Sequence, residues 1–139
     1  MKTFNLKTAK YLAEILYGKK ASDILILNVR RFTMAAEYFV IATANSQVHR
    51  RTLIDELLKK GKGAGGSRVF PGLKPLRIEG TKDSQWVVAD YGGVMVHIMS
   101  PEERLSVALE NLYDGARRSR FPSGKELKKI PLSPKRRTK

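Results

Sequence analysis

Residues 86–99 have the sequence WVVADYGGVMVHIM, and this stretch decides the fold. Its valines and isoleucine favour β-strands, and the central pair Gly92-Gly93 can supply the positive φ that a two-residue hairpin loop requires. The stretch therefore predicts two strands joined by a tight turn. Alternation along the first strand places Trp86, Val88 and Asp90 on one face and the residues between them on the other. A large aromatic and an acid on one short hairpin suit a recognition surface better than a plain core.

Outward from this hairpin, the chain alternates between helical and strand patterns. The order is helix, strand, strand, helix, three strands and a final helix, which predicts an α/β (α+β) domain with a mixed five-stranded sheet flanked by helices. The expected elements are a helix that ends at Gly18, strands at 24–29 and 37–44, a helix at 47–60, a strand at 76–79, the hairpin, and a helix at 101–114.

The final helix has the clearest start signal. Ser100 can cap it, Pro101 suits its first position, and Glu103 stands at capping-box spacing from Ser100. Leucines recur at helical spacing after this start and predict one continuous helix to about Asp114, before Gly115.

Positive charge is concentrated at the end of the chain. The protein has 139 residues and a net charge of +14, and residues 117–139 hold ten Lys or Arg against one acid. We therefore expect a domain over 1–116 and a basic tail over 117–139 that is disordered when alone. Such a tail attracts polyanions, although many basic tails only aid solubility. The candidate RNA-contacting residues are Arg50, Arg51, Arg117, Arg118 and Arg120.

Several functional classes are disfavoured by what the sequence lacks. It contains no cysteine, no apolar run of the roughly 20 residues that a membrane span needs, and no apolar signal segment at its start. These features predict a cytoplasmic protein without a membrane partner. The two histidines, His49 and His97, have no metal-ligand spacing, so we expect no metal site and no cofactor. Residues 61–73 are rich in glycine, and without a Gly-Lys-Ser or Gly-Lys-Thr they predict a mobile surface loop rather than a phosphate-binding loop.

One enzymatic alternative is a small nucleotidyltransferase. The acids Asp23, Glu37, Glu79 and Asp90 could in principle form a two-metal site. That chemistry would need a Gly-Ser turn followed by an Asp-x-Asp pair, and the chain has Gly66-Ser67 but no Asp-x-Asp. We therefore expect the protein not to be an enzyme.

Five short motifs in a fixed order resemble the ribosomal silencing factor (Iojap-like) family. The resemblance covers roughly residues 4–114. The motifs are KKASDI at 19–24, YFVIA at 38–42, EG at 79–80, WVVADYG at 86–92 and LENL at 109–112.

This resemblance implies both a fold and a mechanism. The fold would be akin to the nucleotidyltransferase superfamily without its activity. Members of the family bind the large ribosomal subunit through a ribosomal protein on its subunit-joining face, and their bulk blocks the small subunit and represses translation. The resemblance also suggests a homodimer for the free protein. The alternative is a ribosome-assembly or general RNA-binding protein that acts through the basic tail.

The same resemblance assigns the contact with the ribosomal protein to Trp86, Asp90 and Tyr91, and Val88 lies on the same strand. Each residue also has a structural alternative. Trp86 is either a core residue or an apolar anchor, and Asp90 either forms the turn or pairs with a basic partner residue. Tyr91 either packs against a helix or presents its hydroxyl to the partner.

Overall fold

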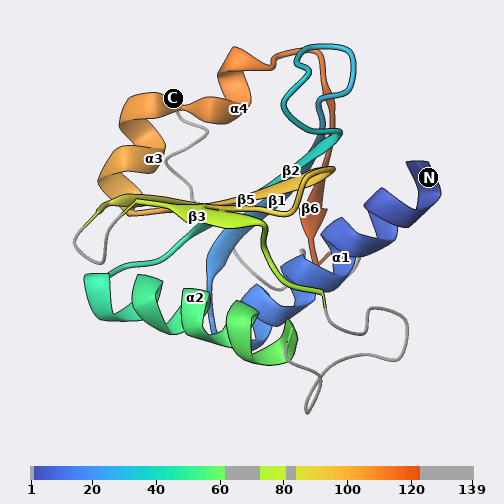
Figure 1. Cartoon of the computed structure of the whole chain (residues 1–139). Helices are drawn as coiled ribbons and strands as arrows, with labels where there is room; N and C mark the ends of the chain where they lie inside the picture. Colours follow the sequence, from blue (N-terminus) through green and yellow to red (C-terminus); the bar gives the residue numbers. More distant parts are fainter. Residues whose placement is uncertain (1, 62–72, 81–83, 123–139) are drawn as a thin grey trace.

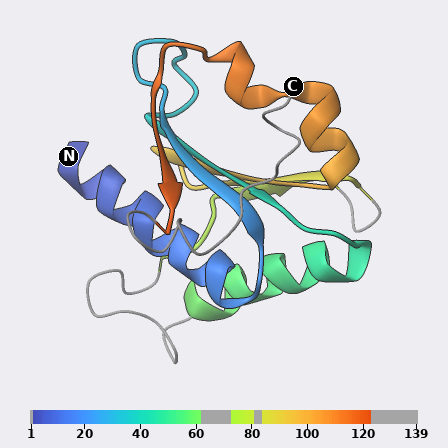
Figure 2. The same ribbon diagram turned by 180° about the vertical axis from the view of Figure 1, so that it is seen from behind.

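A six-stranded mixed sheet forms the centre of the protein, with the strand order β3-β4-β5-β2-β1-β6. The computed structural model describes residues 2–61, 73–80 and 84–122. Helices α1 and α2 cover one face of the sheet and α3 and α4 lie on the other (Figures 1 and 2). The predicted fold class is confirmed, with one strand more than expected. The elements are α1 (Lys2–Gly18), β1 (Ser22–Asn28), β2 (Tyr38–Thr43), α2 (Gln47–Gly61), β3 (Arg77–Glu79), β4 (Trp86–Asp90), β5 (Val94–Met99), α3 (Pro101–Val107), α4 (Leu109–Leu112) and β6 (Arg117–Phe121).

Strand β2 is the most central element, and all six of its residues are buried. It pairs in parallel with β5 and antiparallel with β1. A strand with both faces covered needs a continuous apolar run, which the sequence at 38–42 provides. Side chains of this strand alternate between two apolar clusters. Val40 joins the cluster beneath α1 and α2, whereas Phe39 and Ile41 join the cluster beneath α4.

The predicted hairpin at 86–99 is confirmed in its position and register. Trp86 lies opposite Met99 and Asp90 opposite Met95, which leaves a two-residue loop beyond the Tyr91–Val94 pair. The backbone N–H of Tyr91 donates to the carbonyl of Val94 over 2.8 Å. Gly92 has a φ of +92°, the conformation for which glycine is required at this turn.

The prediction of one continuous final helix is wrong. The Ser100 hydroxyl accepts from the backbone N–H of Glu103 over 3.0 Å, as the capping motif predicted. However, the helix stops at Val107, because Ala108 adopts a left-handed conformation with φ 48° and ψ 53°. On a continuous helix, residues six positions apart would face different directions. The break instead brings the carboxylate of Glu110 to 3.5 Å from Nε of Arg104.

The predicted domain boundary after residue 116 is also wrong, because Arg117–Phe121 form the edge strand β6. This strand pairs antiparallel with β1, from Asn28↔Arg117 to Ile24↔Phe121. It satisfies backbone groups of β1 that would otherwise lie unpaired along a buried apolar strand. Charge composition masked this strand, because an edge strand tolerates a row of arginines that a central strand would not. The remaining tail, 123–139, and the predicted loop at 62–72 lie outside the described residues.

Candidate functional site

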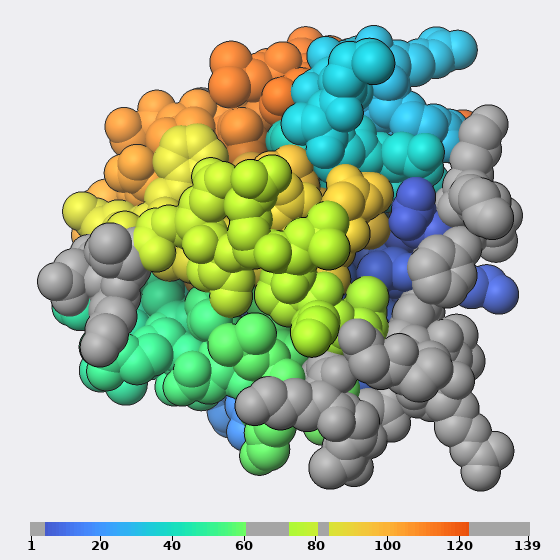
Figure 3. All heavy atoms as spheres, viewed as in Figure 1, coloured from blue at the N-terminus to red at the C-terminus, as the bar shows by residue number. Residues whose placement is uncertain are grey.

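One face of the β3–β4 pair is only partly covered in the part of the chain that the structure describes, with Arg77 and Glu79 exposed and Trp86, Val88 and Asp90 partly buried. We call it the β4 face and define it by Arg77, Glu79, Trp86, Val88 and Asp90. The register places Arg77 opposite Asp90 and Glu79 opposite Val88, so all five side chains share this face. Leu109 of α4 belongs to a buried cluster with residues of β1 and β2 and with Met99, and Trp86 packs against the edge of that cluster. The β3 edge of this face lies at the surface between α2 and the α3–α4 segment (Figure 3).

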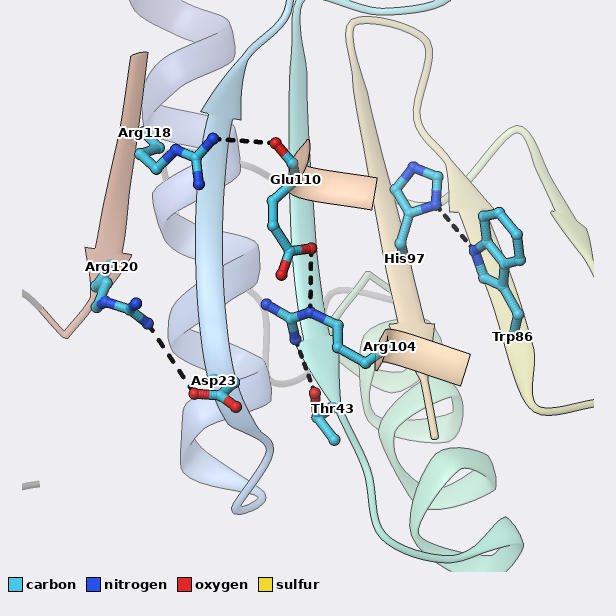
Figure 4. Close-up of polar contacts among 8 residues, drawn as sticks. All are labelled: Asp23, Thr43, Trp86, His97, Arg104, Glu110, Arg118 and Arg120. Atoms are coloured by element: carbon cyan, nitrogen blue, oxygen red, sulfur yellow. Dashed lines mark hydrogen bonds and ion pairs between the residues drawn. The ribbon is translucent and has the colours of Figure 1, made fainter. Parts of the chain in front are cut away.

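Trp86 is half-buried at one end of the β4 face. Its ring packs against the buried cluster that contains Met99. The indole Nε1 donates a hydrogen bond of 3.1 Å to Nδ1 of His97 on the neighbouring strand (Figure 4). Packing and this hydrogen bond hold the indole in one orientation, while part of the ring stays accessible on the sheet face. The orientation of the indole is thus fixed by the fold itself.

His97 is buried, and its ring lies 4.5 Å from that of Phe39 between centroids. Burial lowers the pKa of His97 to about 4, so the imidazole is neutral at neutral pH. Since an indole N–H only donates, Nδ1 must be the acceptor, and the proton of the neutral ring sits on Nε2. Nε2 is itself buried and has no hydrogen-bond partner among the described residues. His97 therefore serves to position Trp86 rather than to exchange protons with solvent.

Asp90 forms the turn and also carries charge on the β4 face. Its Oδ1 accepts from the backbone N–H of Gly92 over 2.8 Å, which is the turn-forming role predicted for it. Its Oδ2 lies 3.5 Å from Nε of Arg77, whose side chain is 66% exposed. The carboxylate is 16% exposed and thus lies near the surface, next to an exposed guanidinium.

Tyr91 lies on the opposite side of the sheet from Trp86. Its ring packs against the cluster beneath α1 and α2. Burial, with a smaller effect from Tyr11, raises the pKa of the Tyr91 hydroxyl far above its ordinary value. The hydroxyl is buried and has no hydrogen-bond partner in the described part of the chain. Of the two alternatives for Tyr91, the structure has packing against a helix.

The five arginines predicted to contact RNA fall into different environments. Arg50 is buried, and it donates to the carbonyls of Ala44 and Ser84 over 3.1 Å each. It joins α2 to the ends of β2 and β4, so we withdraw it as an RNA contact. Its position in a helix of exposed charges gave no sign of this, because one partner, Ser84, is 34 positions away and the other, Ala44, lies outside the helix. Arg51 is exposed on the same helix.

The three arginines of β6 are more accessible. Arg117 is exposed, and Arg118 is exposed although it donates to the carbonyl of Glu110 over 3.0 Å. Arg120 lies 4.0 Å from the carboxylate of Asp23 (Figure 4). The strand therefore presents positive charge along one edge of the sheet.

A buried polar cluster on the α3–α4 side was not predicted. Arg104 is 7% exposed, and its Nη1 donates to the hydroxyl of Thr43 over 2.7 Å. Its Nε faces Glu110 across the break between α3 and α4 (Figure 4). Arg104 lies about 100° around the predicted helix from Leu105, so the pattern of leucines did not indicate its burial. Through these contacts the cluster connects α3 and α4 to each other and to β2.

Three of the four acids considered for a metal site have separate structural partners. Asp23 pairs with Arg120, Glu37 accepts from the Asn5 amide over 3.1 Å, and Asp90 forms the turn described above. Across residues 2–61, 73–80 and 84–122, no three histidine or acidic side chains form a group that could hold a metal ion. Over the same ranges no helix combines the length and the apolar character that a bilayer crossing requires.

Comparison with known proteins gives the family. The sequence profile described as "Ribosomal silencing factor during starvation" matches residues 3–139. The protein named ribosomal silencing factor RsfS in Halalkalibacterium halodurans is 31% identical to this chain, over 70% of this chain and 78% of its own length. The protein of the same name in Bacillus subtilis is 30% identical, over 70% of this chain and 77% of its own length. A chloroplastic Iojap protein of Zea mays is 33% identical over 82% of this chain and 45% of its own length. A crystal structure of a Chromobacterium violaceum protein superposes with a TM-score of 0.66 at 29% identity, over 85% of this chain and 92% of that one. Because the profile matches residues 3–139 and a relative is 31% identical over 78% of its own length, the chain belongs to the family of ribosomal silencing factors.

Proposed function

We propose that this protein represses translation by occupying the free large ribosomal subunit. In this proposal it binds a ribosomal protein on the subunit-joining face and sterically prevents association of the small subunit. The names of the relatives support a role in ribosome silencing, and the proposal adds the mechanism to that role. Steric exclusion requires only that the site be occupied, so no catalytic residue and no cofactor are needed.

The observation that carries the proposal is the open β4 face. Trp86 and Val88 offer apolar area that is only half-buried, and Asp90 with Arg77 offers a polar border. Interfaces of moderate size depend on a few aromatic and apolar anchors surrounded by polar groups. We therefore assign Trp86 as the anchor, Val88 as its apolar neighbour and Asp90 as the group that pairs with a basic residue of the partner.

Tyr91, which the resemblance also implicated, has an indirect role in this proposal. Its ring supports the turn from the far side of the sheet and its hydroxyl is buried. A change of Tyr91 would act on binding through the geometry of the turn that holds Asp90.

A subunit-joining assay tests the mechanism. Purified large subunits are incubated with the protein, small subunits are added, and joined ribosomes are measured on a sucrose gradient. We expect joined ribosomes to decrease as the protein saturates the large subunit. If the subunits join equally well at saturation, the steric mechanism is wrong.

Val88→Arg tests the contact without removing the buried part of Trp86. A charged side chain in the middle of the β4 face should weaken co-sedimentation with large subunits by about thirtyfold or more, the usual effect at an interface hot spot. Val48→Arg is the matched control, because Val48 is 66% exposed on α2, on the other side of the sheet. Equal binding by both variants would place the contact elsewhere.

The alternative, a ribosome-assembly or general RNA-binding protein, depends on the basic tail. Removing residues 123–139 leaves β6 in place and deletes seven of the ten basic residues after position 116. Our proposal expects co-sedimentation and inhibition of joining to persist, with a smaller salt dependence. Loss of both would favour the alternative. The homodimer of the free protein stays a prediction, which light scattering of the purified protein measures.

A further inference from the structure

A concave site distinct from the β4 face lies where the connection from β1 to β2 meets the turn before β6. Figures 1 and 2 show this connection (cyan) beside the segment that joins α4 to β6. The pocket has a volume of about 420 Å³ and is lined by Asn28, Arg30, Arg31, Phe32 and the segment 115–117. Neither the predicted contacts on β4 nor the proposed steric mechanism uses it.

Three of the lining residues are arginines, Arg30, Arg31 and Arg117, and no acidic residue of the described chain lines the pocket. The backbone pairing holds Arg117 directly opposite Asn28. Asp114, just before the lining segment, is exposed and is not part of the pocket wall. Three like charges around one hollow repel each other, and an anion in the hollow would offset that repulsion.

Hydrogen bonding points to the same kind of ligand. Nη1 of Arg30 is buried and has no hydrogen-bond partner among the described residues, an arrangement that costs free energy. The side-chain Oδ1 of Asn28 accepts from the backbone N–H of Arg30 over 3.2 Å. Its amide nitrogen is therefore oriented as a donor. A phosphate oxygen would supply the missing acceptor, once the end of the Arg30 side chain rotates toward the pocket.

Phe32 adds a surface for an aromatic ligand. It is 42% exposed, and its ring contacts Tyr113 at 6.2 Å between centroids. This neighbour supports the ring and leaves part of it accessible. A phosphate site beside an accessible aromatic ring matches one nucleotide, with the phosphate on the arginines and the base stacked on the ring.

We propose that this pocket binds one nucleotide of a single-stranded RNA. Arg30, Arg31, Arg117 and Asn28 hold the phosphate, and Phe32 stacks on the base. A polynucleotide is favoured over a free nucleotide because a chain with a net charge of +14 attracts a polyanion more strongly than a single phosphate. The inference does not rest on the proposed contact through the β4 face.

The test uses the full-length protein and a fluorescein-labelled, single-stranded 12-nucleotide RNA of mixed sequence, with binding followed by fluorescence anisotropy. We expect Arg30→Ala/Arg117→Ala to weaken binding at least tenfold. The slope of log K against log salt should decrease in magnitude by up to about 0.7, the value for one neutralised phosphate of a single strand. Lys7→Ala/Lys10→Ala is the charge-matched control, since both lysines are exposed on α1. This control variant keeps the same basic tail, so the tail contributes equally to RNA binding in both double variants.

Equal losses in the two double variants would overturn the proposal, because they would indicate attraction to net charge alone. Phe32→Ala should weaken binding about fivefold or more with an unchanged salt slope. An unchanged affinity would show that Phe32 does not stack on a base of the RNA. If unlabelled AMP or inorganic phosphate displaces the RNA at the concentration at which unlabelled RNA does, the ligand is a free nucleotide or phosphate and the assignment to RNA is wrong. Circular dichroism melting checks each fold, and Arg31→Ala, at an exposed site, carries the test if the double variant unfolds.

Because the RNA is free in this assay, failure here leaves the subunit-joining mechanism standing. Conversely, failure of the Val88→Arg experiment leaves the RNA pocket standing.

Discussion

Nε1 of Trp86 donates to Nδ1 of His97 across two neighbouring strands, over 3.1 Å. The two residues are eleven positions apart, and the hairpin register places Trp86 beside the pair formed by Val88 and His97. The only tryptophan of the chain is thereby oriented by a neutral, buried imidazole. Protonation of His97 at Nδ1 would remove the acceptor and release the indole.

This pair predicts a pH-dependent stability. His97 has a pKa of about 4 in the folded protein and about 6.5 in the unfolded chain. Between these values the unfolded chain binds the proton more strongly, so acidification favours unfolding. We expect His97 to account for a loss of about 3 kcal/mol in the free energy of unfolding between pH 7.5 and pH 4.

Urea unfolding at both pH values, for wild type and His97→Gln, measures this contribution. All other titrating groups are shared, so the difference between the two proteins isolates His97. An identical pH dependence in both would contradict the lowered pKa.

The Arg104–Glu110 pair predicts a strong coupling in stability. Arg104→Met leaves the Glu110 carboxylate without its cation in a site where the acid side chain is only 19% exposed, and we expect a loss of about 3 kcal/mol. Arg104→Met/Glu110→Gln should recover part of that loss, because no unpaired buried charge remains. A double-mutant cycle of urea unfolding measures the coupling. Additive effects of the two single variants would show that the pair is not energetically linked.

Gly93 predicts a steric effect that a second site relieves. A Cβ at this position would lie 2.5 Å from the Asn5 amide nitrogen, which itself donates to Glu37 over 3.1 Å. Gly93→Ala should therefore lower the free energy of unfolding by about 1 kcal/mol, since the end of the Asn5 side chain must move. In an Asn5→Ala background the same change should cost less than about half of that. Equal costs in both backgrounds would mean that strain arises in the turn itself.

The position of β6 predicts different results for two truncations. Removing residues 123–139 keeps every described strand, so the melting temperature should stay within a few degrees of wild type. Removing residues 117–139 deletes the edge strand and the contact between Phe121 and Tyr17, whose ring centroids are 5.8 Å apart. We expect this second variant to melt at least 10 °C lower, or to aggregate through the exposed edge of β1. Similar melting temperatures would show that β6 adds little to the fold.

The elements that depend on neighbouring residues were predictable from the sequence. The hairpin register follows from alternation and from Gly92-Gly93, and the start of α3 follows from its Ser-Pro-x-Glu cap. The separation of Trp86, Val88 and Asp90 from Tyr91 also follows, because successive side chains of a strand must point to opposite faces. Each of these features involves groups within a few positions of one another.

What only the tertiary structure decided involves partners that are distant along the chain. Buried Arg50 donates hydrogen bonds to two carbonyls, one of them 34 positions away. Buried Arg104 donates to a hydroxyl 61 positions away. Strand β6 exists because β1, which it follows by almost ninety positions, presents a free edge. The arginine pocket likewise requires the register that sets Arg117 against Asn28. Local patterns state which side chains share a face, but the free energy of burying a charge depends on which acceptors the rest of the fold brings to it.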